Sequence, residues 1–233
     1  MTRSITIHVR YNGPPNSGHG GYSAGLIAGV LGGSDVEVTL RKPPPLSVPF
    51  DIEDTEGGIR VTDNGNLIAE ARRFEPAVEA PAAVSFEDAE AASSRYPGLE
   101  HHPFPTCFAC GPQRMDGMRL FAGPIEGRNL AAAPWVPTDS LAGEDGTVAS
   151  EFIWAALDCP GGWGANDFSS GRNAVLGRIA VHISGPVHPG RRYVVVGWPI
   201  GIDGRKMQAG SAIFDEDNSL RAVALATWLL FNE

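Results

Sequence analysis

The sequence predicts an α+β fold in which an antiparallel sheet wraps a buried helix, and it predicts that this arrangement occurs twice. Residues 19–31 and 148–163 are apolar and long enough to form helices, and alternating polar and apolar runs typical of strands follow each of them. The chain has 29 glycines and 19 prolines, which supply the turns between these runs. Residue identity between the halves is slight, so the repeated order of elements is the sign of an internal duplication.

Composition limits the classes of function. With 42% hydrophobic residues, the 233-residue chain can bury a core, and a net charge of −9 argues against a nucleic-acid-binding surface. No apolar run approaches the roughly 20 residues of a membrane span, and the first residues lack the pattern of an export signal. Three cysteines, an odd number, argue against a disulfide framework. We therefore expect a cytoplasmic protein with reduced thiols and neither a nucleic-acid nor a membrane partner.

Strands are expected on both sides of the first helix. The three-proline run that begins at Pro43 interrupts them, and Asn64-Gly65 is a strong hairpin signal. The expected strands of this half span residues 4–10, 35–40, 46–54, 58–62 and 66–71.

The first helix has a glycine at every fourth position: Gly21, Gly25 and Gly29. Residues at this spacing share one face, so we expect the sheet to approach that bare face closely. The start of the helix, His19-Gly20-Gly21, leaves unpaired backbone N–H groups that can bind an incoming oxygen. A purely packing role for the glycines is the alternative.

The middle of the chain reads as a linker followed by a short helix, which Ser85 caps and which continues through Ser94. Cys107 and Cys110 then form a Cys-x-x-Cys pair, with His101 and His102 a few residues before it. A closed zinc site needs about four ligands, and the third cysteine lies far along the chain. We therefore expect two small buried thiols, no bound metal and no cofactor.

The second half repeats the order of the first. Residues 117–122 and 129–135 are expected to form a hairpin before the helix, and the later strands span residues 175–183, 193–198, 206–214 and 220–231.

The second helix carries a single interior carboxylate. Ser150 is expected to cap this helix, and Pro160 and the two glycines after it to end it. Asp158 would then lie in the last turn, on the same face as Trp154 and at the unfavourable negative end of the helix dipole, a cost of about 0.3–1 kcal/mol. A residue placed against its local preference is a candidate for function, and a helix-end residue that reaches water is the alternative.

Three stretches carry a resemblance to the double hotdog proteins of the thioesterase superfamily. The run from Asn16 to Gly21 resembles the His-Gly-Gly entrance to the central helix of many hotdog thioesterases. The cysteine pair with Gly111, followed by Asp116 to Leu120, is similar to the Cys-x-x-Cys-Gly…Gly-Leu-x-Leu leader found before hotdog domains. Asp158 sits where the type II acyl-CoA thioesterases carry a catalytic aspartate. The resemblance implies two hotdog repeats, residues 1–73 and 105–233, joined by a linker, residues 74–104.

This resemblance implies an acyl-CoA thioesterase-like hydrolase that acts on a thioester between the two repeats. Backbone N–H groups near Gly21 and Tyr22 would bind the thioester carbonyl, Asp158 would act as general base or nucleophile, and Thr227 would assist it. The partner would be a coenzyme A ester, whose phosphates need local basic residues, and the resemblance allows a homo-oligomer. The expected substrate contacts are His19, Gly20, Trp154, Arg41, Lys42, Arg178, Arg205 and Lys206.

The sequence also departs from the family pattern. Type II thioesterases pair their aspartate with a Thr or Ser in the following strand and a Gln in the last strand, whereas here the following strand offers Arg178 and His182 and the last strand has no Gln. A non-catalytic hotdog protein that binds an acyl chain or another apolar metabolite is therefore the alternative. A small zinc-stabilised interaction module built on Cys107 and Cys110 is the third hypothesis.

Overall fold

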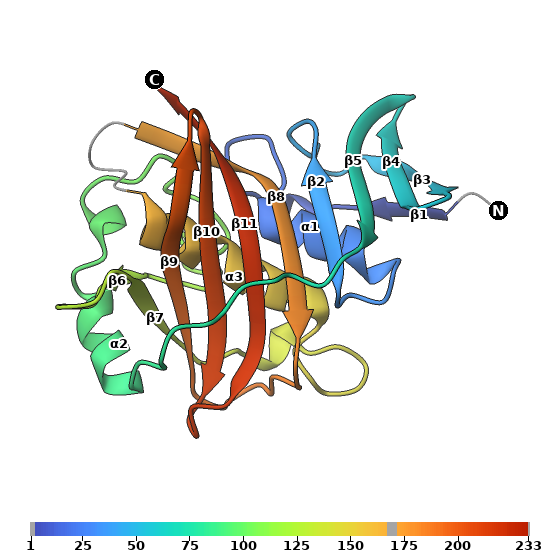
Figure 1. The fold of residues 1–233 in the computed structure, drawn as a ribbon. Coiled ribbons are helices and arrows are strands. Elements are labelled where there is room, and N and C mark those ends of the chain that lie inside the picture. The colour runs from blue at the N-terminus through green and yellow to red at the C-terminus, as the bar shows by residue number, and fades with distance from the viewer. Residues whose placement is uncertain (1–2, 167–171, 233) are drawn as a thin grey trace.

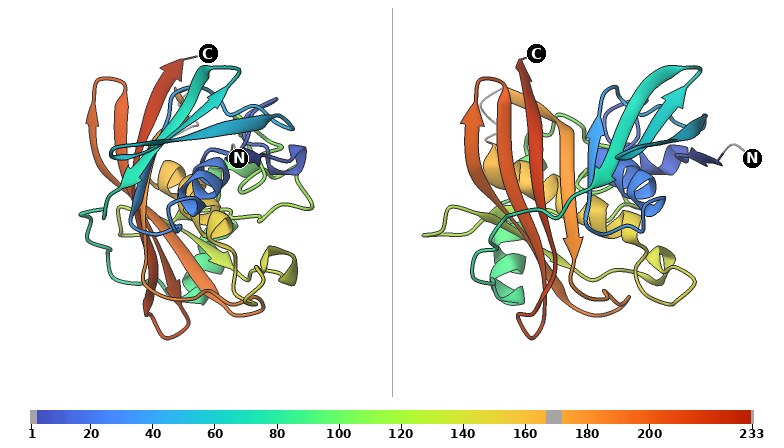
Figure 2. Two further views of the ribbon diagram at one scale, coloured as in Figure 1. Left: turned by 90° about the vertical axis from the view of Figure 1, so that its right-hand side faces the viewer. Right: turned by 45° about the vertical axis from the view of Figure 1, so that its right-hand side comes forward.

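The computed structural model describes residues 3–166 and 172–232. Within these residues, one eleven-stranded antiparallel sheet curves around two helices, α1 and α3, which lie side by side on its concave face (Figures 1 and 2). The strand order is β1-β3-β4-β5-β2-β8-β11-β10-β9-β7-β6. None of the described helices is long and apolar enough to cross a membrane.

The first half follows the predicted order of elements. Both turn residues between β4 and β5 have positive φ, 48° at Asn64 and 77° at Gly65, which confirms the predicted hairpin. The first strand ends earlier than predicted because a 3₁₀ turn, η1 (Val9–Tyr11), follows it. The elements are β1 (Arg3–Thr6), α1 (Gly20–Gly29), β2 (Val36–Leu40), β3 (Pro49–Thr55), β4 (Gly58–Asp63) and β5 (Asn66–Arg73).

The middle segment crosses from one half to the other without regular structure until α2 (Phe86–Ser93). The Ser85 hydroxyl accepts the Asp88 N–H at 3.1 Å, so the predicted cap is confirmed. A 3₁₀ turn, η2 (Pro97–Leu99), precedes the cysteine pair.

The second half contains the longest strands. The expected strand at residues 117–122 is wrong, because this segment pairs irregularly with the cysteine-bearing leader: Met118 and Leu120 donate their N–H groups to Phe108 and Ala109 carbonyls. The elements are β6 (Gly123–Pro124), β7 (Ala131–Trp135), η3 (Asp139–Leu141), α3 (Ser150–Ala165), β8 (Arg172–Ile183), β9 (Tyr193–Asp203), β10 (Lys206–Asp215) and β11 (Leu220–Asn232).

Helix α3 differs from the prediction at both ends. Its N-cap is Ala149, without a side-chain cap, and the helix runs through Pro160 to Ala165. Proline removes one hydrogen bond, but the turn after it is held by close packing, with Gly162 against the Trp228 ring and Gly164 against the backbone of β9. Asp158 therefore lies in the middle of the helix, and the dipole argument for its function does not hold.

The two halves of the sheet have the same strand order. The first is β1-β3-β4-β5-β2 and the second, apart from the short β6, is β7-β9-β10-β11-β8, each with one helix after its first strand. They join where β2 pairs with β8, opposite residues being Val36 with Val181 and Thr39 with Arg178. The pairing makes one continuous sheet over both helices.

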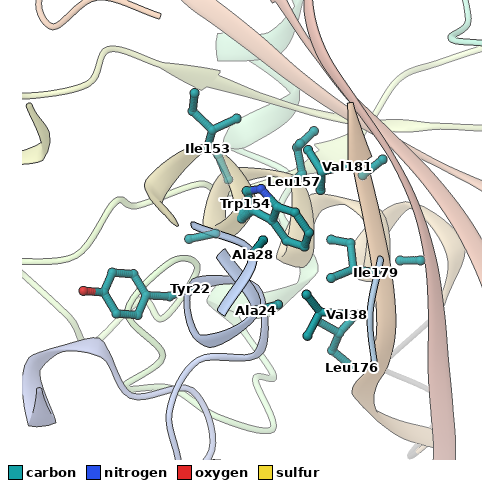
Figure 3. Close-up of a cluster of buried hydrophobic side chains, with 14 of the residues drawn as sticks. Tyr22, Ala24, Ala28, Val38, Ile153, Trp154, Leu157, Leu176, Ile179 and Val181 are labelled. Atoms are coloured by element: carbon teal, nitrogen blue, oxygen red, sulfur yellow. The ribbon is translucent and has the colours of Figure 1, made fainter. Parts of the chain in front are cut away.

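The core lies between the helices and the strands at this junction (Figure 3). Trp154 and Leu157 of α3 lie near Val38 of β2 and Ile179 of β8, and all four side chains are fully buried. The Trp154 indole N–H donates to the Gly33 carbonyl at 2.8 Å. Trp154 is therefore part of the core, and its predicted contact with substrate is wrong.

Glycine allows α1 and α3 to approach each other closely. A Cβ atom at Gly21 would lie 2.5 Å from the Asp158 Cβ, and one at Gly25 would lie 2.6 Å from the Glu151 Cα, whereas a Cβ at Gly29 would meet nothing within 4 Å. The bare face of α1 thus exists as predicted, but helix α3 and not the sheet covers its first two glycines.

We predict that Gly25→Ala destabilises the fold by at least about 1–3 kcal/mol, since the new methyl group would force α1 and α3 apart. Gly29→Ala is the matched control and should leave stability unchanged or raise it slightly, because alanine favours a helix and the space is open. Urea unfolding measures both effects, and equal midpoints for the two variants would contradict the close contact.

Candidate functional site

A cavity of about 370 Å³ lies where the entrance to α1 meets α3. This volume suits a small ligand or part of a larger one. The walls include His19 and Gly20 from the first half, and Asp158, Cys159 and Leu176 from the second half. Segments far apart in the sequence thus form one site.

Asp158 is the buried carboxylate of this cavity, with 2% of its surface exposed. Its Oδ2 accepts the Gly21 N–H at 2.6 Å, while its buried Oδ1 has no hydrogen-bond partner among the described residues. The first turn of α1, the positive end of a helix dipole, faces this carboxylate and stabilises its charge. The Asp158 side chain is therefore held in place through Oδ2, and Oδ1 is available to a ligand.

Burial is the main influence on the pKa of Asp158 and raises it to about 6, with a smaller contribution from the Cys107 thiolate. The charge of His19 and the Gly21 N–H act in the opposite direction. The carboxylate form therefore predominates at neutral pH despite its burial.

His19 caps α1 and also points at the cavity. Its Nδ1 accepts the Tyr22 N–H at 3.2 Å, while its Nε2 lies 3.1 Å from the Cys159 sulfur and 3.6 Å from the Asp158 Oδ2. Because Nδ1 accepts a hydrogen bond, the proton that His19 presents to the cavity is the one on Nε2. His19 is thus a fixed donor toward sulfur and carboxylate.

The backbone donors at the start of α1 are mostly occupied. The N–H groups of Gly21 and Tyr22, predicted to bind a carbonyl, already donate to Asp158 and His19. The Gly20 N–H has no acceptor among the described residues, and Gly20 lines the cavity. Gly20 is therefore the donor at this helix end that is available to a ligand.

The predicted basic residues do not gather at a single site. Arg41 and Lys42 are exposed at the cavity, where Arg41 pairs with Glu70 at 2.7 Å and Lys42 donates to Asn66 at 3.3 Å. Arg178 and Lys206 line a second cavity, which Arg41 also lines, and Arg205 lines neither cavity.

Thr227 also lines the second cavity rather than that of Asp158. Its strand neighbours are Gln208 and Arg178. The structure does not bring Thr227 to Asp158, so the expected assistance of Asp158 by Thr227 is wrong.

Sequence reasoning missed the sulfur-rich wall of the cavity. Cys107 and Cys110 come from the leader and Cys159 from α3, and the Cys107 sulfur lies 3.8 Å from that of Cys159 and 3.6 Å from that of Cys110. The His102 Nε2 lies 3.3 Å from the Cys110 sulfur. Cys159 directly follows Asp158 on the predicted helix, and this signal could have placed Cys159 near the site. The approach of Cys159 to the leader depends on the tertiary fold and has no signal in the sequence.

Comparison with known proteins supports the fold. No protein-family model and no curated protein sequence matches this chain. The tesB protein of Mycobacterium avium subspecies paratuberculosis is similar in structure, with a TM-score of 0.63 and 12% identity over 98% of this chain and 92% of that one. A candidate thioesterase of Novosphingobium aromaticivorans gives 0.60 and 14% identity over 98% and 95%. Such identities establish architecture and not activity, and the chain therefore has a hotdog fold like that of these two structures.

Proposed function

We propose that this protein is an acyl-CoA thioesterase-like hydrolase in which Asp158 activates the attacking water. The observation that carries the proposal is the burial and hydrogen bonding of the Asp158 carboxylate. It is buried in a cavity wall, held through Oδ2 by the Gly21 N–H, and unpartnered at Oδ1 among the described residues. A buried polar atom without a partner costs free energy, which a role toward a ligand explains.

The same proposal includes a double hotdog organisation, with repeats at residues 1–73 and 105–233 and a linker at 74–104. The shared strand order of the two halves supports it. The cavity then lies between the repeats, with His19 and Gly20 from the first and Asp158 from the second.

In this mechanism the thioester carbonyl accepts a hydrogen bond from the Gly20 N–H, at the positive end of α1. Oδ1 of Asp158 takes a proton from a water molecule as that water attacks the carbonyl carbon. The negative charge that develops on the carbonyl oxygen is stabilised by Gly20 and the helix dipole. Collapse of the tetrahedral intermediate releases the carboxylic acid and the thiolate of coenzyme A.

A binding protein without catalysis is the second candidate. The observation that favours it is the lack of a Thr or Gln beside Asp158, because Thr227 and Gln208 line the other cavity. Among the described residues, the polar partners of Asp158 are Gly21 and His19.

We predict that Asp158→Asn lowers the hydrolysis rate of a responsive acyl-CoA by roughly 10²–10⁴-fold, because the amide keeps the shape and removes the base. A panel of acyl-CoA esters of increasing chain length identifies the substrate, and free thiol release measures the rate. Asp139→Asn, at an exposed position, is the matched control and should be as active as the parent.

An equally active Asp158→Asn variant would show that the catalytic assignment is wrong. If the parent hydrolyses no thioester, but both it and Asp158→Asn bind acyl-CoA, the binding function replaces the proposed one.

The rim of the cavity gives a second prediction. Lys42→Glu should raise KM for a coenzyme A ester by about 3- to 10-fold and leave kcat unchanged, because an exposed charge contact contributes about 1 kcal/mol. Arg60→Glu makes the same charge change on an exposed strand position that lines neither cavity, and should leave KM unchanged. Equal shifts in KM would argue against a local contact at Lys42.

A further inference from the structure

Three cysteines that are far apart in the sequence meet in one buried cluster. Cys107, Cys110 and Cys159 are each at most 7% exposed, and all are free thiols. The Cys107 sulfur lies 3.6 Å from that of Cys110 and 3.8 Å from that of Cys159. The proposed hydrolysis uses none of them, so the cluster needs a separate explanation.

The separations of the Cys107 sulfur from the other two sulfurs match those of metal ligands. Tetrahedral zinc binds thiolate at about 2.3 Å, which separates two bound sulfurs by roughly 3.8 Å. The two measured separations, 3.6 and 3.8 Å, are close to this value. His19, Cys107 and Cys159 each present a ligand atom within 4.8 Å of the other two, and Cys110 adds a fourth ligand atom beside Cys107.

Nitrogen donors surround the sulfurs. The Nδ1 atoms of His19 and His102 each accept a backbone N–H, from Tyr22 and Phe104, so the proton that each ring presents to the sulfurs is the one on Nε2. These Nε2 atoms lie 3.1 Å from the Cys159 sulfur and 3.3 Å from the Cys110 sulfur. Such donors suit thiolates and are typical of the groups around a metal centre.

Sulfur ligands decide which metal the cluster would bind. A zinc ion binds cysteine as the thiolate, and sulfur ligands favour zinc over magnesium or calcium. Among the described residues, no Lys or Arg makes a hydrogen bond or ion pair with these sulfurs, so no such side chain occupies the place of a metal.

We propose that Cys107, Cys110 and Cys159 bind one zinc ion through their thiolates, with His19 and His102 donating hydrogen bonds to the bound sulfurs and the fourth position facing the cavity. The expectation that no metal binds was based on two adjacent cysteines, and the structure supplies the third. The site would connect the leader to α3, independently of whether the protein hydrolyses thioesters.

The test uses the full chain, reduced and freed of metal by chelation, and titrated with zinc chloride. We expect one zinc per chain, and a rise in Tm of roughly 5–10 °C with zinc at about 100 times its Kd. Cobalt(II), as a probe, should give thiolate-to-metal charge-transfer absorption. Zinc release should accompany modification of three thiols in the parent protein, a readout that requires no variant to fold.

Cys159→Ser should abolish the stoichiometric binding and weaken the charge-transfer band. His102→Ala should weaken zinc binding by roughly 10- to 100-fold while the band remains, and its exposed neighbour gives the matched control His101→Ala, which should bind normally. Failure of the reduced parent to bind zinc, or unchanged binding by folded Cys159→Ser, would overturn the proposal.

Discussion

The hydrogen bond from the Gly21 N–H to Asp158 is the contact on which the site depends. It forms only because α1 has no side chain at Gly21, where a Cβ would collide with Asp158 itself. The same close approach directs the positive end of α1 at the carboxylate, which compensates for part of the cost of its burial. The close packing of α1 on α3 and the stabilisation of the Asp158 charge therefore depend on the same contact. Separating the two helices would remove the Gly21 N–H from Asp158 and leave the carboxylate charge in an apolar core.

Local signals predicted the parts of the fold that local interactions determine. The turn at Asn64-Gly65, the cap at Ser85 and the start of α1 at His19 all follow from hydrogen bonds within a few residues. Pro160 shows the limit of this reasoning, because a proline normally ends a helix, whereas packing of the following turn against β9 and β11 carries α3 onward. Tertiary contacts of this kind have no signature within the segment itself.

The sequence predicts which helix carries the candidate site, but it does not predict which residues surround Asp158. The sequence pointed to Asp158, but placed it in a final turn beside Trp154, which is in fact a core residue. The predicted Thr227 contact fails because Thr227 lines another cavity. Cys159 was separated from Cys107 by 51 residues of sequence, and only the packing of the leader against α3 brings their sulfurs together.

Asp158 and Cys159 show how one helix serves two neighbouring groups of residues. Successive residues on an α-helix point about 100° apart, so one side chain reaches the start of α1 while the next reaches the leader. Trp163, one turn further along, packs against Tyr96 and His102 on the leader side. If α3 ended at Pro160, Trp163 would lose this position and the leader would lose its support. Continuation of the helix through a proline therefore keeps Trp163 packed against the leader, beside the three cysteines.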